Sequence, residues 1–215
     1  MGYNGDTKNA EVKDFEKTMY LEQDLIKWQR EAGAPLMRRC GVREGDTVID
    51  FGCGIGNYAF AAALAVGETG TVYALDVKTE ILHDLRREAA ERGIAQLIPA
   101  PSHEDAQMDY PDGSADVILI YDLIHALKDR ARFLSESRRV LKDGGILSIL
   151  PFHMTGEEIL EMLDEVGAAG FALQETLPEA GVHFDLHKVY SDRPEALTGM
   201  ELGDIYTFVK AYNRS

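Results

Sequence analysis

The stretch VIDFGCGIGN, residues 48–57, decides the fold of this chain. Its apolar start leads straight into three alternating glycines, Gly52, Gly54 and Gly56, and then into a predicted helix at residues 58–66. Glycine lets a ligand approach the backbone without meeting a side chain, and the N–H groups that open a helix favour an electronegative group. The stretch predicts a strand, a ligand-binding turn and a helix. The alternative is that the glycines serve tight packing alone.

The same turn fits two classes of nucleotide ligand. The run from Gly54 to Ala59 satisfies the dinucleotide pattern G-x-G-x-x-G/A, whereas Asp50, two positions before Gly52, completes the longer pattern D-x-G-x-G-x-G. Asp76 ends the next predicted strand, where a carboxylate can accept hydrogen bonds from both ribose hydroxyls. Asp76 therefore supports a nucleoside ligand without separating the two classes.

The rest of the chain alternates short apolar runs with stretches long enough for helices, which predicts a mostly parallel sheet covered on both faces. The expected strands are residues 47–51, 71–75, 96–100, 117–121, 146–150, 171–176 and 205–209. Apolar spacing at residues 12–32 predicts one or two N-terminal helices. Residues 177–203 have no sustained period, so a hairpin extension and an irregular flap both remain open.

Two later helices have recognisable ends. Thr155 and Glu158 form a capping-box pattern, and Gly167 offers a stop to that helix. The helix expected at residues 131–141 is followed by Lys-Asp-Gly-Gly, so a left-handed glycine cap at Gly144 or its neighbour is expected before the next strand.

Composition narrows the class of protein. A formal net charge of −15 would repel a phosphate backbone, so a small or cationic partner is expected rather than nucleic acid. No apolar run approaches the ~20 residues of a membrane span, which predicts a soluble, cytoplasmic protein. Cys40 and Cys53 are too few for a disulfide framework and form no Cys-x-x-Cys pair, so both are expected to be reduced and structural.

With two further segments, the chain resembles the class I S-adenosylmethionine (SAM)-dependent methyltransferases over roughly residues 44–152. YPDGSADVIL, residues 110–119, looks like that family's segment leading into its fourth strand. RVLKDGG, residues 139–145, is similar to the RVLKPGG that precedes its fifth, with Asp143 in place of proline. Within the family, the chain is most similar to the quinone-biosynthesis C-methyltransferases and related small-molecule enzymes.

This resemblance implies an α/β fold: a three-layer, doubly wound, Rossmann-like sheet of seven strands. The implied strand order is 3-2-1-4-5-7-6, with strand 7 antiparallel, plus N-terminal helices. One methyltransferase domain would span residues 1–215. Residues 1–42 would form a helical lid, residues 43–152 the SAM-binding core and residues 153–215 an acceptor-side half.

The resemblance also implies cofactor contacts. Gly52, Gly54 and Gly56 would lie beneath the methionine moiety of SAM, and Asp50 would order the turn or hold the amino group. Asp76 would hold the ribose. Asn57 and Val77 complete this part of the expected site.

Two further contacts stay open. The family usually places an acidic residue after the third strand to accept from the adenine amino group. Here counting back from Pro111 favours Glu104, while the dipeptide formed with Ala106 favours Asp105. Tyr121 stands where the family often has asparagine, so it faces either cofactor or acceptor.

Histidines are the candidates for proton chemistry. Methyl transfer is an in-line displacement, so alignment supplies much of the acceleration and a base is needed only if the acceptor must lose a proton. His125 and His153 follow strand ends at the ligand edge, which favours catalytic or acceptor-contacting roles, although structural hydrogen bonds also explain them. His103 is expected in the adenine loop. His183 and His187 have a metal-compatible spacing but lack a clear set of further ligands, so no metal is predicted.

The N-terminal aromatics Phe15, Tyr20 and Trp28 line an acceptor pocket under a lid, or else pack in the core. Cys53 is expected to serve the backbone turn rather than act as a nucleophile. Together these features predict a SAM-dependent methyltransferase for a small-molecule acceptor, acting as a monomer or homodimer. The rivals are a SAM-binding protein without turnover and a nicotinamide-dependent oxidoreductase.

Overall fold

The computed structural model describes residues 23–183 and 201–211, and the side chains of residues 183 and 201 lie outside that description. Residues 23–28 are helical and continue into the elements that follow. These are η1 (Gln29–Gly33), α2 (Ala34–Arg39), β1 (Thr47–Phe51), α3 (Asn57–Val66), β2 (Thr71–Asp76), α4 (Thr79–Glu91), β3 (Leu97–Pro101), β4 (Ala115–Tyr121), η2 (Ile124–Ala126), α5 (Arg130–Val140), β5 (Leu141–Leu150), α6 (Gly156–Ala168), β6 (Phe171–His183) and β7 (Glu201–Lys210).

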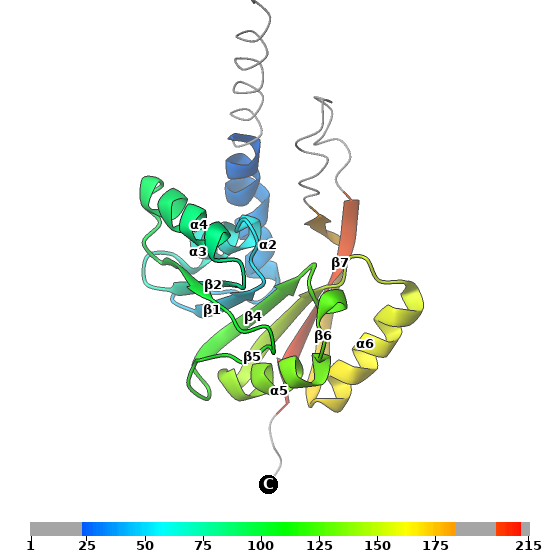
Figure 1. Cartoon of the computed structure of the whole chain (residues 1–215). Helices are drawn as coiled ribbons and strands as arrows, with labels where there is room; N and C mark the ends of the chain where they lie inside the picture. Colours follow the sequence, from blue (N-terminus) through cyan, green and yellow to red (C-terminus); the bar gives the residue numbers. More distant parts are fainter. Residues whose placement is uncertain (1–22, 184–200, 212–215) are drawn as a thin grey trace, which may run out of the picture.

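The strands form one seven-stranded sheet in the order β3-β2-β1-β4-β5-β7-β6. Pairs among β1 to β5 are parallel, and β7 runs antiparallel to both β5 and β6. Helices α2, α3 and α4 cover one face, and α5 and α6 cover the other (Figure 1). The predicted three-layer α/β fold and its strand order are therefore confirmed. In the described ranges, no helix is long and apolar enough to cross a membrane.

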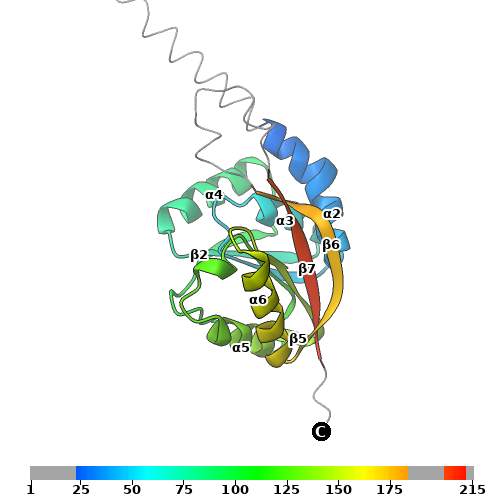
Figure 2. The ribbon, with the colours of Figure 1, turned by 90° about the vertical axis from the view of Figure 1, so that its right-hand side faces the viewer.

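Helix α3 is buried on nearly every side because its alanine-rich sequence NYAFAAALAV fits between two layers. One side packs on the sheet, and the other lies under η1 and α2, which cross it as the outermost layer (Figure 2). A helix that is apolar all round needs such a cover. The N-terminal helical segment thus completes the core above the glycine turn.

The glycine predicted to cap the helix before β5 has a different place. Helix α5 ends at Val140, and Leu141 is already extended, with φ −67° and ψ 137°. Gly144 takes a left-handed φ of +76°, but it lies inside β5, where the pairing with β4 shifts between Ala115 and Val117. The strand therefore begins earlier than expected, and the glycine serves an irregularity in the sheet.

Helix α6 begins as predicted, with the capping box of Thr155 and Glu158 formed in both directions. Its stop is not Gly167, since the helix runs on to Ala168. Gly170 follows with φ +86°, and its carbonyl accepts a 2.7 Å hydrogen bond from Arg138. The left-handed residue therefore lies just beyond the helix, before β6 starts.

The first part of the uncertain segment 177–203 is a hairpin extension. Strand β6 continues to His183 and pairs with β7 through Leu177↔Ile205 and Val182↔Leu202. The Tyr58 hydroxyl donates to the Val182 carbonyl at 2.8 Å and accepts from its N–H at 2.6 Å. This extension is therefore fixed to the start of α3, beside the glycine turn.

We expect Tyr58→Phe to loosen the extension while the sheet stays folded. The change leaves a buried backbone N–H without its phenol partner, which costs about 1–3 kcal/mol. Amide exchange measured by NMR should therefore be faster at Val182. Tyr206→Phe removes the same atom from β7 on the other side of the sheet, and it should leave exchange at Val182 unchanged. Equal protection in Tyr58→Phe and the unsubstituted protein would contradict the anchoring role.

Candidate active site

Two adjoining cavities lie at the carboxyl ends of the parallel strands, where open α/β sheets bind ligands. The larger measures about 410 Å³ and the smaller about 230 Å³, and Gly52 and Asp122 line both. The larger is also lined by Phe51, Asp76, Val77, Lys78, Ser102, His103, Glu104, Leu123, Ala126, Leu127 and Lys128. The smaller is also lined by Asp50, Cys53, Gly54, Ile55, Asn57, Tyr58, Tyr121, Leu150 and Val182.

Glycine is needed at the three positions of the turn for different physical reasons. All have left-handed backbone, with φ of +80° at Gly52, +52° at Gly54 and +86° at Gly56. A Cβ at Gly52 would overlap the Leu123 side chain, and one at Gly56 would overlap Leu85. A Cβ at Gly54 would meet nothing within 4 Å. Packing explains two of the glycines, and only Gly54 leaves open space in which a ligand can approach the backbone.

Asp76 holds the turn from the end of β2. Its Oδ2 accepts from the Gly54 N–H at 3.0 Å, and its Oδ1 accepts from the Lys78 N–H at 2.9 Å. A carboxylate oxygen carries more than one lone pair, so each can still accept from a ligand hydroxyl. Asp76 and its neighbour Val77 both line the larger cavity, which suits them to a sugar.

Asp50 brings a buried acid to the smaller cavity. It is only 2% exposed, and within the described part of the chain its Oδ2 has no hydrogen-bond partner. Burial, with a further contribution from the charge of Asp76, raises the pKa of Asp50 to about 7. An ammonium or sulfonium group bound beside it would stabilise the ionised carboxylate, so the chemistry of this position fits a cationic ligand.

The acidic pair after β3 separates in the structure. Glu104 lines the larger cavity and lies 3.5 Å from Lys128. Asp105 instead pairs with Arg132 at 2.9 Å, and Ala106 is buried in the core with φ +61°. Of the two acids, Glu104 is therefore the one at the cavity.

His103 lies beside this pair and also lines the larger cavity. Its Nε2 is 2.7 Å from Asp109 Oδ2, and this hydrogen bond is the main reason that the pKa of His103 is raised. The imidazole is thus positioned within the loop where adenine is expected.

The smaller cavity has an aromatic wall. The rings of Tyr58 and Tyr121 meet edge to face with centroids 4.6 Å apart, and Trp28 meets Tyr58 in the same manner at 5.4 Å. The Tyr121 hydroxyl is hydrogen-bonded to Ser148 Oγ at 2.8 Å, so its ring edge and face are what the cavity meets. Asn57 opens α3 beside them.

Cys53 lies in the same wall as a buried thiol. Burial raises its pKa far above the ordinary value, which opposes a nucleophilic role. Cys40 is buried too, and neither cysteine forms a disulfide.

Neither His125 nor His153 is among the described residues that line the two cavities. Asp122 connects them to the site: its Oδ1 is 3.5 Å from His153 Nε2 and 4.0 Å from His125 Nδ1. The two imidazole rings are 5.3 Å apart. Both histidines are candidates from the sequence alone, whereas Asp122 is not among the predicted site residues. Its position directly after a strand, at the end of the sheet where ligands bind, is the signal that could have identified it.

The remaining predicted positions divide between surface, core and the undescribed ranges. His83 is exposed on α4. Phe15, Tyr20 and His187 lie outside the described residues, and the side chain of His183 is not described. Across residues 23–183 and 201–211, no group of three or more histidine, cysteine, aspartate or glutamate side chains could hold a metal ion.

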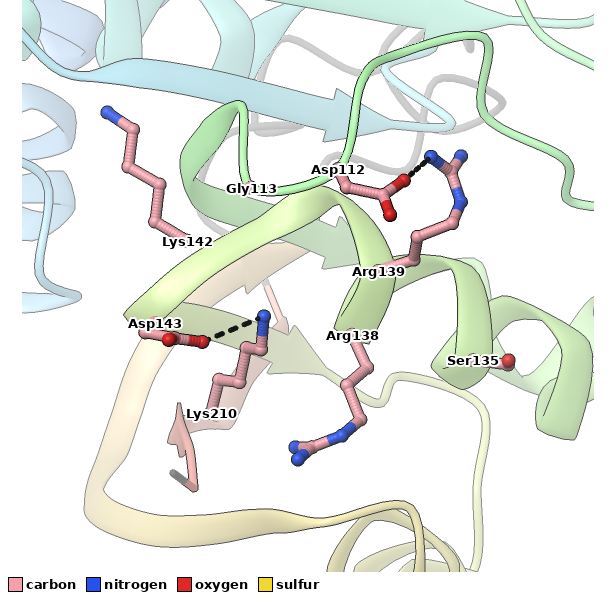
Figure 3. Close-up of a pocket in the computed structure, with 8 residues that line it drawn as sticks. All are labelled: Asp112, Gly113, Ser135, Arg138, Arg139, Lys142, Asp143 and Lys210. Atoms are coloured by element: carbon pink, nitrogen blue, oxygen red, sulfur yellow. Dashed lines mark hydrogen bonds and ion pairs between the residues drawn. The ribbon is translucent and has the colours of Figure 1, made fainter. Parts of the chain in front are cut away.

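A further cavity, of about 600 Å³, lies at the other end of the sheet, where the parallel strands β4 and β5 begin (Figure 3). It is bordered by the starts of β4 and β5 and the end of β7. Its basic side chains are engaged: Arg139 pairs with Asp112 at 2.8 Å, and Lys210 pairs with Asp143 at 3.2 Å. These contacts connect elements of the fold, so this cavity is a structural junction.

We expect Gly54→Ala to abolish binding of SAM or S-adenosylhomocysteine while costing only about 1–2 kcal/mol of stability, since the added methyl group enters ligand space rather than the core. Gly93→Ala is a matched control because Gly93 also has positive φ, at +66°, and a Cβ added there would likewise meet nothing within 4 Å. Isothermal titration and thermal unfolding of both variants test this. If Gly54→Ala still binds the ligand, the ligand does not approach the backbone at Gly54.

The acid Asp50 gives a pH prediction for the ligand-free protein. Its folded pKa of about 7 exceeds the ordinary value near 4, so between about pH 4 and pH 7 the folded chain holds a proton that the unfolded chain releases. Stability contributed by this group therefore falls as pH rises through that window. In urea unfolding, the free energy of unfolding of Asp50→Asn should rise relative to that of the unsubstituted protein from about pH 5 to about pH 8. Asp84→Asn, which changes an exposed carboxylate, should show no such rise.

Comparisons with known proteins agree with this geometry. Residues 49–149 match the family described as a methyltransferase domain. A demethylmenaquinone methyltransferase from Geobacillus stearothermophilus is 34% identical over 124 residues, which are 56% of this chain and 50% of that protein. The chloroplastic 2-phytyl-1,4-beta-naphthoquinone methyltransferase of Arabidopsis thaliana is 26% identical over 166 residues, covering 76% of this chain and 62% of that protein.

The chain thus spans less than two thirds of the length of each of these relatives. The crystal structure of a SAM-dependent methyltransferase from Aquifex aeolicus shares the fold, with a TM-score of 0.64 at 22% identity over 85% of this chain and 90% of that one. The family match covers β1 through most of β5, the part that carries the glycine turn. Residues 49–149 therefore match a methyltransferase domain, and the described fold is the one that the SAM-dependent methyltransferase from Aquifex aeolicus also has.

Proposed function

We propose that this protein transfers a methyl group from SAM to a small-molecule acceptor. The observation that carries the proposal is the open backbone face of Gly54, whose N–H donates to the Asp76 carboxylate beside two cavities that share Gly52 and Asp122. We place the activity in the cytoplasm because Cys40 and Cys53 are free thiols, which suits a reducing compartment.

Charge separates SAM from a nicotinamide dinucleotide. Four carboxylates, from Asp50, Asp76, Glu104 and Asp122, line the two cavities, against two lysines, Lys78 and Lys128. SAM carries a sulfonium and an ammonium group, which such a site attracts, whereas the pyrophosphate of a dinucleotide would be repelled. The oxyanion-rich dinucleotide is therefore the poorer fit, although the glycine spacing alone permits it.

The proposed contacts follow from the lining of the cavities. Asp76 and Val77 would hold the ribose, and Glu104 would accept from the adenine amino group. The turn at Gly52, Gly54 and Gly56, with Asn57, would lie against the methionine moiety, whose amino group would approach Asp50. Tyr121 would offer its ring to the methyl-bearing end. When bound, SAM supplies an activated methyl group, and these residues align it and exclude water.

The acceptor is proposed to be a planar, largely apolar molecule. Tyr58, Tyr121 and Leu150 line the smaller cavity, which favours a ring that stacks or packs edge to face. The names of the two curated relatives point to naphthoquinone rings, which have this shape. A reduced naphthoquinone is therefore the first acceptor to test. The net charge of −15 continues to disfavour nucleic acid.

We expect Asp76→Ala to weaken S-adenosylhomocysteine binding by about 10- to 100-fold, because a charge-assisted contact to the ribose and the anchor of Gly54 are lost together. Asp84→Ala removes an exposed carboxylate from α4 and should bind as the unsubstituted protein does. Isothermal titration measures both. Equal affinity in the two variants would show that Asp76 does not contact the ligand. Absence of binding by the unsubstituted protein would refute the proposed function.

Turnover separates an enzyme from a SAM-binding protein that lacks activity. Transfer of tritium from methyl-labelled SAM to a reduced naphthoquinone, or to a fractionated metabolite extract, is the expected result. Tight binding of S-adenosylhomocysteine with no labelled product from either source would favour the binding protein.

A further inference from the structure

Asp122 occupies the seam between the two cavities and is one of the two residues that line both. Its backbone is left-handed, with φ +55°, and so is that of His153, with φ +61°. Non-glycine residues rarely adopt this conformation, and such strain gathers at functional sites. Here two such residues face each other across the ligand edge of the sheet.

One carbonyl holds the two loops together. Leu150 ends β5, and its oxygen accepts from the Asp122 N–H at 2.9 Å and from the Phe152 N–H at 3.1 Å. The loop after β4 and the loop after β5 are therefore held at a fixed separation. This brings His153 Nε2 to 3.5 Å from Asp122 Oδ1.

The two ends of this pair have different surroundings. Asp122 Oδ1 is inaccessible to solvent, while the side chain as a whole is 32% exposed and lines both cavities, so Oδ2 is the carboxylate oxygen left to meet a ligand. His153 is 51% exposed. A proton taken up at the cavity therefore has a short route through Asp122 and His153 to water.

We propose that Asp122 is a catalytic residue that takes the proton of the methyl acceptor, and that His153 is a positioning residue that passes this proton to solvent. The inference rests on the proposed function. It restricts the acceptor to molecules whose reacting atom carries a proton, such as a hydroxyl, a thiol or an acidic ring carbon.

The step balances without any further reactant. The bond between the acceptor atom and its proton breaks, and the proton goes to Asp122 Oδ2. The electron pair left on the acceptor atom forms the new bond to the methyl carbon. The bond from that carbon to sulfur breaks, and its pair stays on sulfur. The Asp122 carboxyl group then rotates to bring this proton to Nε2 of His153, and the imidazole releases a proton to water from Nδ1.

A carboxylate fits this role better than either imidazole because neither histidine lines the cavities in the described part of the chain. Charged and titratable groups near the pair include His125, whose ring is 5.3 Å from that of His153, and Glu158, which interacts electrostatically with His125. Tyr58 interacts electrostatically with Asp122, and Asp50 lines the smaller cavity together with it. These groups belong in any interpretation of a pH profile.

The test compares Asp122→Asn and His153→Ala with the unsubstituted protein. Asparagine tolerates the left-handed backbone, so Asp122→Asn should fold. The assay follows tritium from methyl-labelled SAM to two acceptors: a reduced naphthoquinone, which loses a proton, and a pyridine, whose nitrogen has none to lose. Titration with S-adenosylhomocysteine reports cofactor binding, and exposed His83→Ala is the matched histidine control.

We expect Asp122→Asn to lower kcat for the naphthoquinol by about 100-fold or more, with little change for the pyridine and in S-adenosylhomocysteine affinity. His153→Ala should lower kcat less, and added imidazole should restore it, which a purely structural histidine would not show. An unchanged kcat for the naphthoquinol, or a loss of cofactor affinity in Asp122→Asn, overturns the inference. Failure of the unsubstituted protein to bind S-adenosylhomocysteine would instead overturn the proposed function.

Discussion

The hydrogen bond from the Gly54 N–H to the Asp76 carboxylate is the contact on which the site depends. It joins the turn after β1 to the end of β2, and the N–H groups of Gly52 and Cys53 reinforce it by donating to the Leu75 carbonyl. The turn is thereby shaped before any ligand arrives, which limits the entropy lost on binding. Asp76 both builds the turn and faces the larger cavity, so recognition and architecture share one side chain.

Carboxylates lie at both ends of the parallel strands, in different surroundings. At the far edge, acidic side chains have cations beside them, as in the pairs of Lys142 with Asp116 and of Lys210 with Asp143. At the ligand edge, the carboxylates of Asp50, Asp76 and Asp122 gather around the two cavities. The carboxylates around the cavities are thus placed to meet a positively charged ligand.

The fold was predictable because its signals are local: alternating apolar runs, the glycine turn and a capping box each occupy a few consecutive residues. Element ends were less predictable, since the place of Gly144 depends on how β5 pairs with β4. Individual roles in the site depend on distant side chains. Leu123 and Leu85 fill the space beside Gly52 and Gly56, whereas the space beside Gly54 is open, and this difference depends on the fold. The role inferred for Asp122 likewise depends on its contact with His153, which lies on another loop.

The buried Asp50 carboxylate has a consequence at the level of the living cell. The buried carboxyl group of Asp50 lowers the free energy of unfolding of the ligand-free protein. A cationic ligand bound beside it would raise that free energy. Proteases degrade chains that open often. Under the proposed function, the lifetime of this protein should therefore follow the supply of SAM, so that a cell short of this methyl donor would hold fewer copies of the protein.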